Sequence, residues 1–158
     1  MRVGILHSLT GAMAANERLL LDAALLAIAE INQAGGVLGE PLEPVIADGA
    51  SDPQEFARQA SQLIQHDRVT NLFGGWVSES RKAILPIVEA SDSLLWYPAR
   101  YEGLEASRHV FYTGLCPNQQ VEPAIAWLLQ HHYQRIFVLG TENACSRTIS
   151  TLVKAQIG

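Results

Sequence analysis

The sequence has few cysteines and no long apolar run. Only two cysteines occur in 158 residues, and Cys116 and Cys145 form neither a Cys-x-x-Cys pair nor a pattern with histidine at metal-ligand spacing. We therefore expect no metal and no cofactor, and we interpret both side chains as small interior thiols, with a disulfide between them as the alternative. The longest apolar stretch, residues 19–29, is interrupted by Asp22 and is too short to cross a bilayer.

Basic residues are too few and too scattered for a nucleic-acid-binding protein. Eleven Lys and Arg against sixteen Asp and Glu give a net charge of −5, with both signs interspersed along the chain. No basic stripe attracts phosphates and no polybasic block suits a membrane surface, so nucleic acid is not an expected partner. Met1 leads directly into a predicted strand without a secretory signal, and the compartment, periplasm or cytoplasm, is left open.

Common catalytic motifs are also absent. The sequence contains no Gly-x-Ser-x-Gly, no phosphate loop, no Gly-x-Gly-x-x-Gly and no His-Glu-x-x-His. Gly74-Gly75 lacks a third glycine and is followed by the bulky Trp76, which disfavours a nucleotide site. His7, at the end of the first predicted strand, is either a ligand contact or a satisfied interior histidine. The sequence predicts a protein that is not an enzyme.

The pattern along the chain is an alternation of β-branched apolar segments with amphipathic ones, which is typical of βαβ units around a parallel sheet. With 48% apolar residues, the chain can bury a sizeable core. We expect an α/β fold with a parallel, Rossmann-like sheet. The predicted strands are residues 3–7, 42–47, 70–74, 93–97, 110–113 and 135–139. The predicted helices are residues 14–33, 53–66, 78–90, 119–130 and 147–157.

Polar and aromatic residues collect where the predicted strands end. Ser8 and Thr10 follow the first strand, Trp76 and Ser78 follow the third, and Tyr97 ends the fourth. Open parallel sheets bind ligands at the carboxyl ends of their strands, so we expect these side chains to meet at one crevice. The predicted helix start at Ser78 supplies backbone N–H groups that suit a carbonyl or carboxylate oxygen. The expected ligand is a small molecule.

Five longer segments extend over nearly the whole chain and read HSLTG, IAEINQAGGVLG, GWVSESRKAILP, YPARYEG and FYTGLCPNQQ. Together they resemble the type I periplasmic-binding-protein family, and within it the urea and short-chain amide branch. The opening motif and the AGG turn are shared with amino-acid-binding relatives, whereas SxSRKA, YPxxYEG and PNQQ are more specific.

The resemblance implies two α/β lobes that close on a ligand like a jaw. Residues 1–118 would form the first lobe and residues 119–158 the beginning of the second, with 135–140 as its first strand. By the same resemblance, Ser78 grips the ligand, Tyr97 and Trp76 are aromatic pocket positions, and Ala99 occupies a position where relatives have valine or threonine. The implied function is the substrate-binding component of a urea or amide ABC transporter, with the permease as its partner.

Two further functions stay open at this point. One is a cytoplasmic amide sensor that controls an amidase operon through an antiterminator. The other is binding of branched-chain amino acids, because Asn143 and Cys145 occupy positions where amide-binding relatives have tyrosines. We also expect a homo-oligomer or an exchange of tails between copies, because apolar residues 136–139 and the last helix would lack cover.

Overall fold

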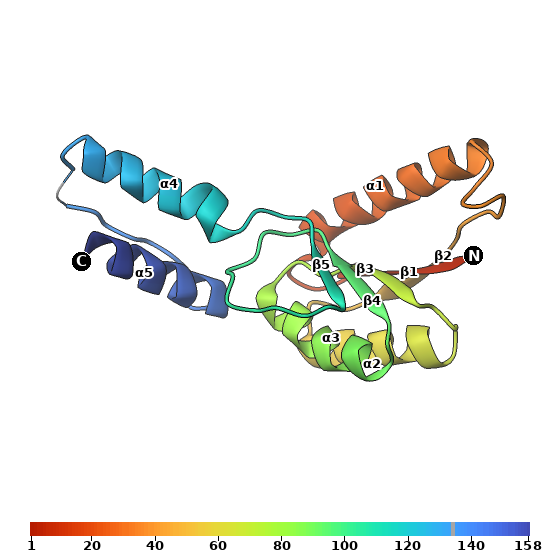
Figure 1. Cartoon of the computed structure of the whole chain (residues 1–158). Helices are drawn as coiled ribbons and strands as arrows, with labels where there is room; N and C mark the ends of the chain where they lie inside the picture. The colour runs from red at the N-terminus through yellow and green to blue at the C-terminus, as the bar shows by residue number, and fades with distance from the viewer. Residues whose placement is uncertain (134) are drawn as a thin grey trace. The chain divides into compact units, whose positions relative to one another are not determined.

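The structure is a computed structural model that describes residues 1–133 and 135–158 (Figure 1). These residues form two compact units. Unit 1 comprises residues 1–99 and 106–113, and unit 2 comprises residues 100–105 and 114–158. The predicted lobe boundary after residue 118 lies near the point where the chain enters unit 2 for the second time, and it stays a prediction.

Unit 1 is built on a five-stranded, wholly parallel sheet. Its strands are β1 (Arg2–His7), β2 (Glu43–Asp48), β3 (Asn71–Gly74), β4 (Leu94–Tyr97) and β5 (Val110–Tyr112), in the order β2-β1-β3-β4-β5. The register pairs Ile5 with Phe73, and Phe73 with Trp96. The predicted α/β fold with a parallel sheet is confirmed, and each of the five strands lies within one residue of its predicted bounds.

Three helices connect the strands of unit 1. They are α1 (Ala14–Gln33), α2 (Pro53–Gln65) and α3 (Ser78–Ala90). Figure 1 shows α1 on one face of the sheet and both α2 and α3 on the other. The start of α2 follows from its sequence: the Asp52 carboxylate accepts hydrogen bonds from the N–H groups of Gln54 and Glu55, and Pro53 occupies the first turn.

The core of unit 1 lies between the sheet and the pair α2 and α3. It consists of buried side chains from the central strands and from the inner faces of these helices, among them Leu6, Phe56, Leu63, Leu72, Ile84, Val88 and Leu95. β1 is an inner strand with α1 and α2 as helical neighbours, and its apolar residues Val3, Ile5 and Leu6 are all buried, which is why it reads as a nearly continuous apolar run.

Unit 2 contains α4 (Pro117–Gln130) and α5 (Ala144–Ile157), which pack on each other. The predicted strand at residues 135–139 is wrong: these residues have no regular secondary structure. A strand needs a neighbour to receive its hydrogen bonds, and all five strands of the described residues belong to the unit 1 sheet. No helix in the described ranges is both long and apolar enough to cross a membrane.

The turn after β3 depends on Gly74. The Gly75 N–H donates to the Leu6 carbonyl at 3.0 Å, which draws the backbone of this turn against β1. A Cβ on Gly74 would overlap the Leu6 carbonyl oxygen, and the Gly74 φ of 154° is one that L-residues rarely adopt. Gly39 also has a positive φ, 81°, but its Cβ would meet no atom within 4 Å.

These two glycines give a matched test of the turn. Gly74→Ala should lower the free energy of unfolding by about 2–4 kcal/mol, because steric overlap adds to backbone strain. Gly39→Ala should cost only about 1 kcal/mol, from backbone strain alone. Urea unfolding followed by circular dichroism measures both variants. Equal losses of stability would contradict the proposed close approach of the turn to β1.

Candidate functional site

The carboxyl ends of three neighbouring strands meet at one edge of the sheet, which we term the carboxyl edge. β1, β3 and β4 are adjacent and parallel, so residues that directly follow them share this edge. Ser8 follows β1, Trp76 and Ser78 follow β3, and Tyr97 is the last residue of β4. The structure therefore brings these four residues to a common edge, and their role as ligand contacts stays a prediction.

The two hydroxyls predicted to contact a ligand, those of Ser8 and Thr10, form hydrogen bonds within the protein that stabilise the loop after β1. The Ser8 side chain is fully buried, and its Oγ accepts a hydrogen bond from the Ser51 N–H at 3.1 Å. The Thr10 Oγ1 donates to Asp48 Oδ2 at 2.7 Å. Thr10 is exposed and Ser8 is not. In this structure, the hydroxyl groups of Ser8 and Thr10 serve the loop, and this role was not visible from the sequence.

Asp48 is the anchor of this loop. Its Oδ1 accepts from the N–H groups of Leu9, at 2.8 Å, and Ala50, at 2.8 Å. Burial alone would raise the pKa of Asp48. Hydrogen bonds from the Thr10 hydroxyl and from the backbone of Ala50, Leu9 and Thr10 outweigh that effect and hold the pKa of Asp48 below its usual value.

A second carboxylate, Glu17, holds the end of β1 itself. Glu17 Oε2 lies 3.0 Å from His7 Nδ1 and accepts from the Ser8 N–H at 3.0 Å. Both side chains of the pair are buried. His7 is therefore the satisfied interior histidine of the two alternatives that the sequence left open. Glu17 Oε1 has no hydrogen-bond partner among the described residues.

α3 begins at Ser78, as predicted, but Ser78 is its first helical residue rather than its N-cap. Val77 is the N-cap, with an extended backbone and no side-chain cap hydrogen bond. The first N–H groups of a helix lack intrahelical carbonyl partners and carry the positive end of the helix dipole. This helix end therefore suits a carboxylate or carbonyl oxygen. Ser80, which no sequence motif singled out, has a buried hydroxyl without a partner in the described part of the chain.

The two aromatic residues predicted at the carboxyl edge, Tyr97 and Trp76, differ in their exposure to solvent. Tyr97 is fully buried, and its hydroxyl donates to the Trp76 carbonyl oxygen at 2.7 Å. Trp76 is 37% exposed. Ala99, two residues beyond β4, is buried. Of these two aromatic residues, Trp76 therefore offers a ligand an exposed surface at the carboxyl edge.

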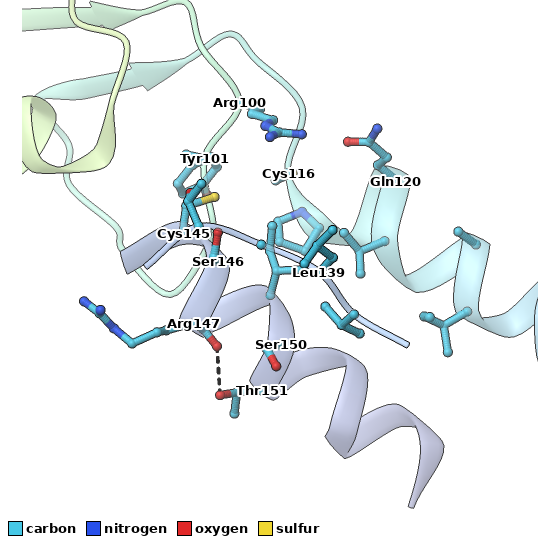
Figure 2. Close-up of a pocket in the computed structure, with 18 of the residues that line it drawn as sticks. Arg100, Tyr101, Cys116, Gln120, Leu139, Cys145, Ser146, Arg147, Ser150 and Thr151 are labelled. Atoms are coloured by element: carbon cyan, nitrogen blue, oxygen red, sulfur yellow. Dashed lines mark hydrogen bonds between the residues drawn. The ribbon is translucent and has the colours of Figure 1, made fainter. Parts of the chain in front are cut away.

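Unit 2 contains a cavity of its own, with a volume of about 890 Å³. Figure 2 shows Arg100, Tyr101 and Gln120 around it, together with the first turns of α5. The start of α5 is capped by Asn143, whose side chain accepts from the Ser146 N–H at 2.8 Å. Arg147 is ion-paired with Glu142. The cavity is thus lined by polar and apolar groups of one unit, without an aromatic side chain at position 143 or 145.

Both cysteines line this cavity and both are free thiols. Cys116 Sγ donates to Asn118 Oδ1 at 2.9 Å at the start of α4. Each is partly exposed rather than interior. Within residues 1–133 and 135–158, no group of three or more His, Cys, Asp or Glu side chains is arranged to hold a metal ion.

The lowered pKa of Asp48 predicts an acid dependence of stability. The folded-state pKa lies below the unfolded value of 3.8, so ionised Asp48 stabilises the fold above that pH, and this stabilisation is lost as the pH falls through the folded pKa. Asp48→Asn should lower the stability at neutral pH by about 1 kcal/mol and weaken the loss of stability below about pH 4. Thermal unfolding at several pH values measures this, with Asp22→Asn, on α1, as the control. Identical pH profiles for Asp48→Asn and the parent chain would contradict it.

The whole chain matches a known family. Residues 1–158 match the family described as periplasmic binding protein domain. A leucine-, isoleucine-, valine-, threonine- and alanine-binding protein of Pseudomonas aeruginosa is 29% identical over 160 residues, which cover 99% of this chain and 43% of that protein.

Solved structures show the same fold. The branched-chain amino acid transporter substrate-binding protein LivJ of Streptococcus pneumoniae, in complex with isoleucine, has a TM-score of 0.87 and 21% identity, with 99% of this chain and 46% of that chain covered. A solute-binding protein of an ABC transporter from Rhodopseudomonas palustris, in complex with 3,4-dihydroxybenzoic acid, has a TM-score of 0.89 and 20% identity, with coverage of 99% and 43%.

The chain thus spans less than half the length of the relatives it matches. The type I family inferred from the sequence motifs is confirmed. The narrower assignment to the urea and amide branch is not shown, since these relatives are described as binding amino acids or an aromatic acid. By a match along its full length, the chain belongs to the periplasmic binding protein domain family, type I.

Proposed function

We propose that this chain provides one wall of a binding site for a small solute, as part of the solute-binding component of an ABC transporter. The observation that carries the proposal is the position of the α3 N-terminus at the carboxyl edge, beside the exposed Trp76. A helix N-terminus carries hydrogen-bond donors and the positive end of the helix dipole, and the indole supplies an apolar surface. The proposal involves no covalent chemistry.

The ligand class that fits best is a small carboxylic acid with an apolar part, and a branched-chain amino acid in particular. The relatives named above are described with amino acids or an aromatic acid, all of which carry a carboxylate. A carboxylate is also the group that a helix N-terminus favours most, because the helix dipole and the N–H groups both attract negative charge. The ligand's apolar part would contact Trp76.

Urea or a short-chain amide is the second candidate. The segments SESRKA and YPARYEG favour it, because they resemble the amide-binding branch. A neutral planar ligand would place its carbonyl oxygen at the α3 N-terminus. It would then need acceptors for its N–H groups elsewhere, because an unpaired polar group in a closed site is costly. The partner would be the permease of the transporter or, for a cytoplasmic amide sensor, an antiterminator.

Calorimetric titration with isoleucine, acetamide, formamide and urea tests the ligand class. We expect isoleucine to bind with a dissociation constant of about 1 mM or weaker, because a jaw-like site draws on two lobes and this chain spans less than half of its relatives. Ser78→Ala should weaken binding by about 1–2 kcal/mol through a lost hydrogen bond. Ser61→Ala, on α2, is the control. Tighter binding of acetamide than of isoleucine would favour the second candidate.

We also propose that the chain self-associates. In unit 2, Phe137 is 88% exposed and Leu139 87%. In unit 1, Trp96 stacks between Phe73 and Phe111, with ring centroids 5.8 and 4.2 Å apart, and both phenylalanines are more than one third exposed. Exposed apolar groups of this kind commonly mark contact surfaces.

Light scattering coupled to size exclusion measures the association state. The parent chain should be a dimer or larger at high concentration. Replacing both Phe137 and Leu139 by serine should shift it toward monomer, because the exposed apolar area falls. Phe111→Ser separates the contribution of unit 1. A monomeric parent chain at every concentration would refute the proposal.

A further inference from the structure

Arg81 is a buried arginine on α3. A ligand site at the start of this helix does not by itself explain why the arginine is buried. Arg81 lies one turn after Ser78, and its side chain is fully buried. Burying a guanidinium costs several kcal/mol unless the charge meets compensating groups. In the sequence, Arg81 stands out only as part of the family motif SESRKA.

The guanidinium of Arg81 packs on aromatic rings. Its Cζ lies 5.0 Å from the centroid of the Tyr97 ring and 5.9 Å from that of Tyr112. The two tyrosine rings meet edge to face, with centroids 6.5 Å apart. The two distances from the Arg81 guanidinium to the tyrosine rings are within the range of a cation–π interaction. Such an interaction is stronger when the pair is removed from water. Arg81 thus fixes the face of Tyr97 that is turned toward α3.

Tyr97 in turn contacts the loop that carries Trp76. Its hydroxyl donates to the Trp76 carbonyl oxygen at 2.7 Å. The ring also lies against Gly75: a Cβ added there would come within 3.3 Å of Tyr97 Cε2. The Tyr97 ring therefore contacts both Arg81 and the Gly75-Trp76 backbone.

We infer that Arg81 is a positioning residue for the site: through Tyr97 it sets the position of the exposed Trp76. Arg81 is not proposed to contact the ligand, and its proposed effect on Trp76 passes through the tyrosine. The inference rests on the proposed function in taking Trp76 as a ligand wall. The chain of contacts from Arg81 to Trp76 can be tested without any ligand.

Acrylamide quenching of Trp76 fluorescence provides that test. The chain has three tryptophans, so the Trp76 signal is the difference between each protein and its Trp76→Phe counterpart. In Arg81→Met, the quenching constant of Trp76 should rise about twofold, because the loop gains local freedom. Arg81→Lys, which keeps the charge but lacks the planar guanidinium, should give a smaller rise. Arg58→Met, an exposed arginine on α2, should give none.

Tyr97→Phe separates positioning from general stability. This variant keeps the ring that contacts Arg81 but removes the hydroxyl that donates to the Trp76 carbonyl. The quenching constant of Trp76 should therefore rise, as in Arg81→Met. The double variant with Arg81→Met and Tyr97→Phe should show little more quenching of Trp76 than the single variant with the larger effect. Both substitutions act through the same contact between Tyr97 and the Trp76 backbone. If Arg81→Met does not fold, Arg81→Lys and Tyr97→Phe decide the matter.

The two outcomes are distinct. Unchanged Trp76 quenching in folded Arg81→Lys and Tyr97→Phe would overturn the inference, whatever the protein binds. Changed Trp76 quenching together with failure of the parent chain to bind isoleucine or acetamide would sustain the positioning role and count against the proposed function instead.

Discussion

The close parallel pairing of β1 with β3 is the constraint on which the site depends. The Gly75 N–H bonds to the Leu6 carbonyl, and the turn after β3 has no room for a side chain at Gly74. This pairing aligns the end of β3 with the end of β1, and β4 extends the same edge on the other side of β3. The start of α3, Trp76 and the loop after β1 are neighbours because these backbones lie in register.

Much of this arrangement could be predicted from the sequence, because local patterns determine it. The cap at Asp52 and the glycines at the end of β3 mark element ends, and β-branched apolar segments mark the strands. The strand predicted at residues 135–139 shows the limit of that reasoning. Residues 136–139 are apolar enough for a strand, but pairing depends on a neighbour that the pattern of one segment does not contain.

The roles of single side chains were harder to predict, because their partners are distant in sequence. Ser8 and Thr10 read as ligand hydroxyls, yet they bond to Ser51 and Asp48, about 40 residues away. The burial of Arg81 had no signal in the sequence, since arginine is seldom buried. The amide branch was inferred from short motifs at helix starts and loops. Such motifs encode local geometry, which proteins with different ligands can share.

The central claim is that the α3 N-terminus at the carboxyl edge receives the carboxylate of a small solute. Amide chemical-shift mapping by NMR tests this most directly, because it locates a weak contact residue by residue. On titration with isoleucine, the largest shifts should occur at the backbone N–H groups of Ser78, Glu79 and Ser80 and at the Trp76 indole. Shifts confined to the opposite edge of the sheet, at the starts of β1 and β4, or to the cavity of unit 2, would contradict the account.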